Sequence, residues 1–181
     1  SAAFATLLPM QLDEPLATDV GLAYLLFRIA DTLEDAPLWG RDKRKAALDS
    51  FGAWLGREPE AGQRWVDLAT HAAPIDDAGC LALLARAEGV RASASQRGEE
   101  LSAAMTAHVG RTTAKMAQFV ARQTDDGGLV LTGIEDLRAY CYAVAGIVGE
   151  LLTEMFWLRD RSLEPHRAAL MELAPAFGGR F

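Results

Sequence analysis

The sequence predicts an all-α protein that forms a single domain over residues 1–181. Apolar residues recur at intervals of three and four through several long stretches, which is the spacing of a helix buried on one side. No stretch of useful length alternates apolar and polar residues, and prolines and glycines separate the helical stretches. Half of the residues are hydrophobic and 24% are charged, so the chain has ordinary globular composition and enough length for one core.

The first expected helix runs from about Leu16 to Asp35. Pro15 suits the first turn of a helix, and Pro37 stops the helix beyond Asp35. A short helix is expected at 81–86, limited by Gly89, and a polar link follows at 91–96. The other helices expected in this part of the chain lie at 43–55, 64–73 and 99–122.

A long helix is expected to begin at Thr132 and to continue to about Trp157. Thr132 and Glu135 have the spacing of a capping box, in which each side chain satisfies a free backbone amide of the other residue. Gly146 and Gly149 lie inside this helix, where each costs about 1 kcal/mol relative to alanine. Such a cost predicts close approach by a backbone or a ligand. The expected inner stripe is Leu137, Tyr140, Cys141, Val144, Ala145, Val148, Leu151, Leu152 and Met155. A final helix is expected at 165–174, ended by Pro175.

Charge and composition argue against several classes of protein. The formal net charge of −7 gives a nucleic-acid partner no electrostatic support, and an anionic substrate would need cations and local arginines. Two cysteines form neither a disulfide framework nor a zinc pattern, and they fit a reducing, cytoplasmic location. No charge-free run of transmembrane length is present, so at most peripheral contact with a membrane is expected.

The stretch from Tyr24 to Asp35 carries the strongest sign of chemistry. Asp31, Glu34 and Asp35 share one helix face with Arg28, one turn earlier. Acidic clusters on helices most often lie on a face that is exposed to solvent. Here the preceding residues are apolar nearly all round, which indicates a buried helix whose charges must be compensated. Mg²⁺ is the simplest candidate, because it binds through one or two carboxylates together with substrate phosphates.

Two stretches resemble the signatures of the squalene and phytoene synthase family. AYLLFRIADTLED at 23–35 resembles the first aspartate-rich motif, and YCYAVAGIVGELLTEMF at 140–156 resembles the second signature helix. They occur in the family's order, and the resemblance covers roughly 1–36 and 105–157. It implies an isoprenoid-synthase-type helical bundle around a central cavity, incomplete at the C-terminus.

The implied activity is head-to-head condensation of two prenyl diphosphates through a cyclopropyl diphosphate. Farnesyl diphosphate, giving squalene or a related C30 product, is favoured over geranylgeranyl diphosphate, giving phytoene. The cofactor implied is Mg²⁺, with NADPH in addition if squalene is the product. Asp31 and Asp35 match the metal-binding aspartates, with Glu34 in the acidic position between them. Arg28 and Tyr24 match residues that face the diphosphate.

The prenyl chain would lie along the second signature helix. Tyr140 matches the tyrosine near the reacting carbons, and Phe4 matches a phenylalanine of the N-terminal motif. The wall of the prenyl slot corresponds to Val144, Gly146, Val148 and Leu152. Ser1 to Ala3 lack the basic residue and the second serine usual before that phenylalanine.

The family's second aspartate-rich motif is not found in this sequence, and Asp160 does not supply it. Three interpretations follow. The chain is a portion of a longer enzyme, a second polypeptide supplies the missing half of the site, or the chain binds prenyl ligands or assembles with a partner without turnover. A plain structural domain with no ligand is the remaining alternative.

Overall fold

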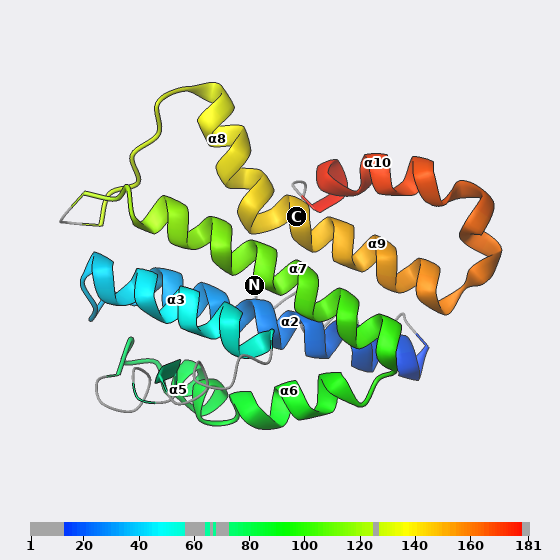
Figure 1. Ribbon diagram of the computed structural model, residues 1–181, viewed down its shortest axis with the longest axis horizontal. Coiled ribbons are helices and arrows are strands. Elements are labelled where there is room, and N and C mark those ends of the chain that lie inside the picture. Colours follow the sequence, from blue (N-terminus) through cyan, green and yellow to red (C-terminus); the bar gives the residue numbers. More distant parts are fainter. Residues whose placement is uncertain (1–12, 57–63, 66, 68–72, 125–126, 179–181) are drawn as a thin grey trace.

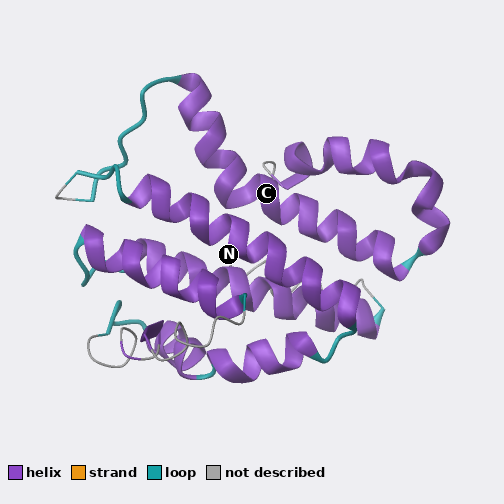
Figure 2. Ribbon diagram, viewed as in Figure 1, coloured by secondary structure: helices purple, strands orange, loops and turns teal. Residues whose placement is uncertain are grey.

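The computed structural model describes residues 13–56, 64–65, 67, 73–124 and 127–178. All regular secondary structure in these ranges is helical, so the all-α prediction is confirmed (Figure 2). Of the expected helix at 64–73, the structure describes only Arg64, Trp65, Asp67 and Ala73. Phe4 also lies outside the described residues.

Helices α2 (Glu14–Asp35), α3 (Arg41–Leu55) and α7 (Glu99–Val120) form the centre of the bundle. α7 packs against α3, α2 and α9 (Ile147–Arg159), and in Figure 1 its ribbon runs between those of α3 and α9. The three central helices match the predicted ones to within two residues at each end. Their inward residues are buried, and several have no exposed surface, among them Ile29, Leu33, Phe51 and Val109.

Helices α5 (Ala78–Ala85) and α6 (Ala87–Ser95) cover α2. The expectation that Gly89 ends a helix before a polar link is wrong, because α6 runs through both. Ala87, Val90 and Ala94 form a buried stripe at helical spacing. Gly89 lies on the exposed side of α6, where a missing side chain costs no packing.

The helix expected from Thr132 to Trp157 is divided into three parts. α8 (Ile134–Cys141) is followed by a π-helical turn, η2 (Tyr142–Gly146), and then by α9. α8 projects from the bundle (Figure 1) and has no buried residue, so the prediction that Leu137 and Cys141 face the core is wrong.

The start of α8 is also capped differently from the prediction. The backbone amide of Thr132 donates to the carboxylate of Asp136 at 2.9 Å, and so does its hydroxyl at 3.3 Å. Glu135 instead pairs with Arg138 on the exposed side of α8. Asp136, which also pairs with Arg122, therefore takes the place expected for Glu135.

The chain then returns along α9. A short 3₁₀ helix, η3 (Arg161–His166), leads into α10 (Arg167–Gly178), which packs on α9 and η2 (Figure 1). Pro175 lies inside α10, so the expectation that it ends the last helix is wrong. The close backbone approach predicted for Gly149 is found: a Cβ there would lie 2.1 Å from the carbonyl oxygen of Ala174.

A buried ion cluster joins three distant segments. The side chain of Asp19 on α2 has no exposed surface. It accepts a hydrogen bond of 2.5 Å from Arg97, which precedes α7, and one of 2.7 Å from Arg159 at the end of α9. Both carboxylate oxygens are therefore paired, as a buried charge requires.

One described stretch, Ile134–Arg159, is long and apolar enough to span a membrane by length and composition. It comprises α8, η2 and α9. Of its most apolar window, 44% is buried inside the protein, and α9 contributes Leu151 and Met155 to the core. A core helix passes the same test, so this stretch alone carries no conclusion about a membrane.

Candidate active site

The last two turns of α2 bring three carboxylates together. Glu34 is buried, Asp31 is half-buried and Asp35 is exposed. Burial raises the pKa of Asp31 to about 6, against the opposing effect of Arg28. Burial, followed by the charges of Asp35 and Asp31, raises the pKa of Glu34 to about 7. Burial and mutual repulsion thus disfavour the ionised carboxylates, and a bound cation would offset both effects.

The oxygen atoms of this cluster fit a hard cation. Oε1 of Glu34 is buried and has no hydrogen-bond partner, while the backbone oxygen of Glu34 accepts from Arg44 at 3.1 Å. Carboxylate oxygens are the ligands that Mg²⁺ prefers. Within the described ranges, however, no three Asp, Glu, His or Cys side chains converge in a metal-binding arrangement. A Mg²⁺ ion at these carboxylates would need phosphate, water or further carboxylates to complete its coordination.

Arg28 lies one turn before Asp31 and is held from the other side by α5. Its Nη2 donates to the sulfur of Cys80 at 3.6 Å. Burial opposes the charge of Arg28, yet the neighbouring Cys80 and Asp31 together raise its pKa above the usual value. A permanently charged guanidinium beside the carboxylates suits an anionic group such as a diphosphate.

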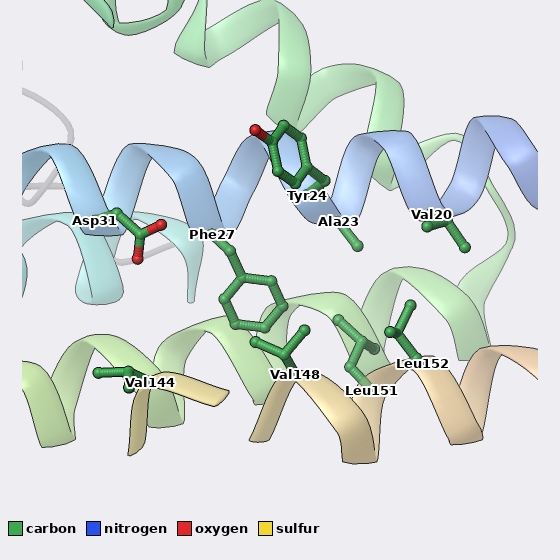
Figure 3. Close-up of a pocket in the computed structure, with 9 residues that line it drawn as sticks. All are labelled: Val20, Ala23, Tyr24, Phe27, Asp31, Val144, Val148, Leu151 and Leu152. Carbon is green, nitrogen blue, oxygen red and sulfur yellow. The ribbon is translucent and has the colours of Figure 1, made fainter. Parts of the chain in front are cut away.

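A cavity of about 130 Å³ lies between α2 and the η2–α9 segment. Figure 3 shows side chains from the two segments facing each other, with the carboxylate of Asp31 at one end and Val20 and Leu152 toward the other. Apart from Asp31 and Tyr24, the lining residues are apolar. The lining residues are Val20, Ala23, Tyr24, Phe27, Asp31, Val144, Val148, Leu151 and Leu152.

Three of the four residues expected in the slot wall line this cavity: Val144, Val148 and Leu152. Gly146, the fourth, does not. A Cβ on Gly146 would lie 2.6 Å from Cδ2 of Tyr142, so its small size makes room for that ring rather than for a ligand. Binding of a prenyl chain by the other three stays a prediction.

Three lining residues on α2 were not predicted from the sequence: Val20, Ala23 and Phe27. They stand on the same face of α2 as Asp31, at spacings of three and four residues, so helical periodicity extended backward from the carboxylates would have found them. Leu151 was predicted only as a core residue.

Tyr140 reaches the carboxylate cluster from the last turn of α8. Its hydroxyl donates a hydrogen bond to Glu34, and its ring packs edge-on against Phe119 with centroids 5.2 Å apart. Burial, followed by the negative charges of Glu34 and Asp35, raises the pKa of Tyr140 to about 12. The phenol is therefore neutral at physiological pH and can donate a hydrogen bond or a proton.

The described site thus consists of an apolar cavity with Asp31 at one end, and of Arg28, Glu34 and Asp35 beside Asp31 on the same helix. The profile of the squalene/phytoene synthase family matches residues 5–179, nearly the whole chain. The protein belongs to this family, whose members are prenyltransferases that condense prenyl diphosphates head to head and generally require Mg²⁺. A search of curated proteins gave no match.

Proposed function

We propose that the chain binds a prenyl diphosphate, farnesyl diphosphate by preference, and takes part in its head-to-head condensation to squalene or a related C30 product. The observation that carries this proposal is the cavity between α2 and α9, which has Asp31 at one end and apolar walls beyond it. The diphosphate would lie near Arg28 and the carboxylates, and the prenyl chain would extend toward Leu152. Condensation of geranylgeranyl diphosphate to phytoene is the alternative within the family.

The residues of the site suit the ionisation of an allylic diphosphate. Mg²⁺ held by Asp31 and Asp35 would supply positive charge for the departing pyrophosphate. Arg28 would stabilise the same developing charge through its guanidinium. The apolar side chains, Phe27 among them, would exclude water so that the carbocation meets a second prenyl chain. Tyr140 would act at the reacting carbons, through its ring face or by moving a proton.

The metal site needs more ligands than the described residues provide. Because these residues hold no converging group of three metal-binding side chains, the proposal includes a second set of oxygen ligands. These would come from elsewhere in the same polypeptide or from a second chain. We further propose a cytoplasmic location with peripheral membrane contact, since an apolar product must leave the water phase. NADPH would be required only if squalene is the product.

The decisive experiment compares Mg²⁺-dependent pyrophosphate release from farnesyl diphosphate by the wild type, Asp31→Asn and Asp35→Asn. Both variants are expected to lose turnover while keeping the helical circular dichroism of the wild type. Asp49→Asn is the matched control, because Asp49 is exposed on α3 and pairs with Lys45 outside the site. Undiminished turnover in both site variants would refute the proposal.

The incomplete metal site also favours a second candidate function, a prenyl-ligand-binding or assembly subunit without turnover. That candidate predicts thermal stabilisation by Mg²⁺ and a farnesyl thiodiphosphate, but no pyrophosphate release from farnesyl diphosphate. Stabilisation together with release supports the enzyme. If neither stabilisation nor pyrophosphate release is observed, the result supports the interpretation of the chain as a structural domain.

A further inference from the structure

The π-helical turn η2 stands between the two segments that build the site. In a π-helical turn the hydrogen bonds run from i to i+5, which accommodates one residue more than an α-helical turn. One residue corresponds to about 100° of rotation in an α-helix. The turn therefore sets the direction in which α8, with Tyr140 in its last turn, faces relative to α9.

Tyr142, the first residue of the turn, is fixed by both its ring and its hydroxyl. The hydroxyl donates to Oε1 of Glu150 at 2.8 Å and accepts a short hydrogen bond from Arg111 on α7. Glu150 comes eight positions after Tyr142, which is about 12 Å along an α-helix. The ring must therefore lie lengthwise over the turn, and it does so against Gly146, where a Cβ would be 2.6 Å away.

The partners of Tyr142 are themselves held in place. Arg111 donates to Oε2 of Glu150 at 2.7 Å, so these two side chains and the phenol are bonded to one another. The side chain of Glu150 is only 13% exposed, and a carboxylate so buried requires such partners. His108 on α7 adds a contact of 2.8 Å to Glu154, one turn further along α9. The clamp, defined as Tyr142, Arg111 and Glu150, thus ties η2 to α7 and α9.

Residues on either side of Tyr142, in α8 and in η2, belong to the candidate site. Tyr140, two residues before Tyr142, reaches Glu34 and Phe119, and Val144 within the turn lines the cavity. If the turn relaxed to an ordinary α-helical turn, α8 would rotate and Tyr140 would leave both partners. The residues that line the cavity include none of the three clamp residues.

We propose that Tyr142, Arg111 and Glu150 are positioning residues, which hold the π-helical turn and thereby hold Tyr140 against Glu34 of the carboxylate cluster. The catalytic part of this inference rests on the proposed function, whereas its geometric part does not. Clamp residues are expected to affect the reaction through Tyr140 and not through binding of the diphosphate, because Arg28 and Asp31 lie on α2.

The first test is a double-mutant cycle on turnover. Tyr142→Phe keeps the ring over Gly146 and removes both hydrogen bonds. It is expected to lower kcat about 10- to 100-fold with little change in KM, the size of effect expected when a reacting group is misplaced. In a Tyr140→Phe background the same change is expected to have little further effect, because the residue through which it acts is already altered. An equal loss in both backgrounds would overturn the proposal.

The second test does not depend on turnover, so it separates failure of this inference from failure of the proposed function. The ring resonances of Phe119 in NMR spectra report the edge-on contact with Tyr140. Tyr142→Phe is expected to shift them toward their positions in Tyr140→Phe. Thr153→Ala is the control, because it removes another hydrogen bond on α9, to the backbone of Gly149, outside the clamp. Unchanged Phe119 resonances in Tyr142→Phe would overturn the geometric claim.

Discussion

Gly149 and Gly178 lie backbone to backbone where α10 crosses α9. A Cβ on Gly149 would be 2.6 Å from the amide nitrogen of Gly178, and a Cβ on Gly178 would be 2.1 Å from the carbonyl oxygen of Ala145. Both obstacles are backbone atoms, which cannot turn aside as a flexible side chain can. The two helices can therefore approach this closely only because both positions lack a side chain.

Replacing Gly149 with alanine is expected to destabilise the protein by about 2 kcal/mol. Alanine gains about 1 kcal/mol in helix propensity, but overpacking against fixed backbone costs about 3 kcal/mol. Urea denaturation measures the difference. Gly110→Ala is the matched control, because Gly110 lies inside α7, where an added Cβ would meet nothing within 4 Å. It is expected to be neutral or stabilising, and a destabilisation equal to that of Gly149→Ala would contradict the packing argument.

Removal of the buried charge of Asp19 is expected to weaken the bundle substantially. Asp19→Asn leaves Arg97 and Arg159 without their carboxylate, and we expect a loss of about 3 kcal/mol in the free energy of unfolding. The comparison is Asp49→Asn, which removes the exposed pair with Lys45 and is expected to cost about 0.5 kcal/mol or less. Similar losses in the two variants would show that the Asp19 cluster does not join the three segments as the geometry indicates.

The central helices could be predicted because local sequence and tertiary packing agree there. In α2, Pro15 lies in the first turn, Pro37 follows the end of the helix, and most of the buried positions between them are apolar. In α6 the exposed Gly89 was misleading, since a glycine outside the core is compatible with a helix. In α8 the apolar Leu137 is 40% exposed, so composition alone gave the wrong orientation.

The carboxylate end of the site could be predicted, but its geometry could not. Spacing alone places Asp31 and Asp35 on one face of α2, and no tertiary information is needed for this. The π-helical turn has no local signature, because it depends on contacts that Tyr142 makes with α7 and with Glu150. From the sequence, Gly146 is assigned to the wall of the prenyl slot, because the sequence cannot show the position of the Tyr142 ring. In the structure, Gly146 makes room for that ring.

The pairing of Asp136 with Arg122 predicts a pH dependence of stability. The hydrogen bond from Arg122, followed by that from the amide of Thr132, holds the pKa of Asp136 well below its usual range. A carboxyl with a lowered pKa in the folded state stabilises the protein above the unfolded pKa of about 3.9, and this contribution is lost as the pH falls through the folded pKa. The difference in Tm between wild type and Asp136→Asn is therefore expected to be largest near neutral pH and to narrow below about pH 4.

The control for this pH dependence is Glu135→Gln. Glu135 pairs with Arg138 on the exposed side of α8, where both side chains are more than two-thirds exposed. This variant is expected to change Tm little at any pH. A wild-type advantage over Asp136→Asn that stayed constant from pH 8 to pH 3 would show that the substitution acts through packing and not through the ionised carboxylate.

The two cysteines are expected to differ sharply in reactivity. Cys141 is exposed at the end of α8, whereas Cys80 is buried and its sulfur accepts a hydrogen bond from Arg28. A thiol reagent such as Ellman's reagent is expected to titrate one thiol rapidly in the native protein and two in denaturant, since reaction requires access to the sulfur. Cys141→Ser should remove the rapid phase and leave the denatured protein with one thiol. Two equally rapid thiols in the native protein would show that Cys80 is not stably buried beside Arg28.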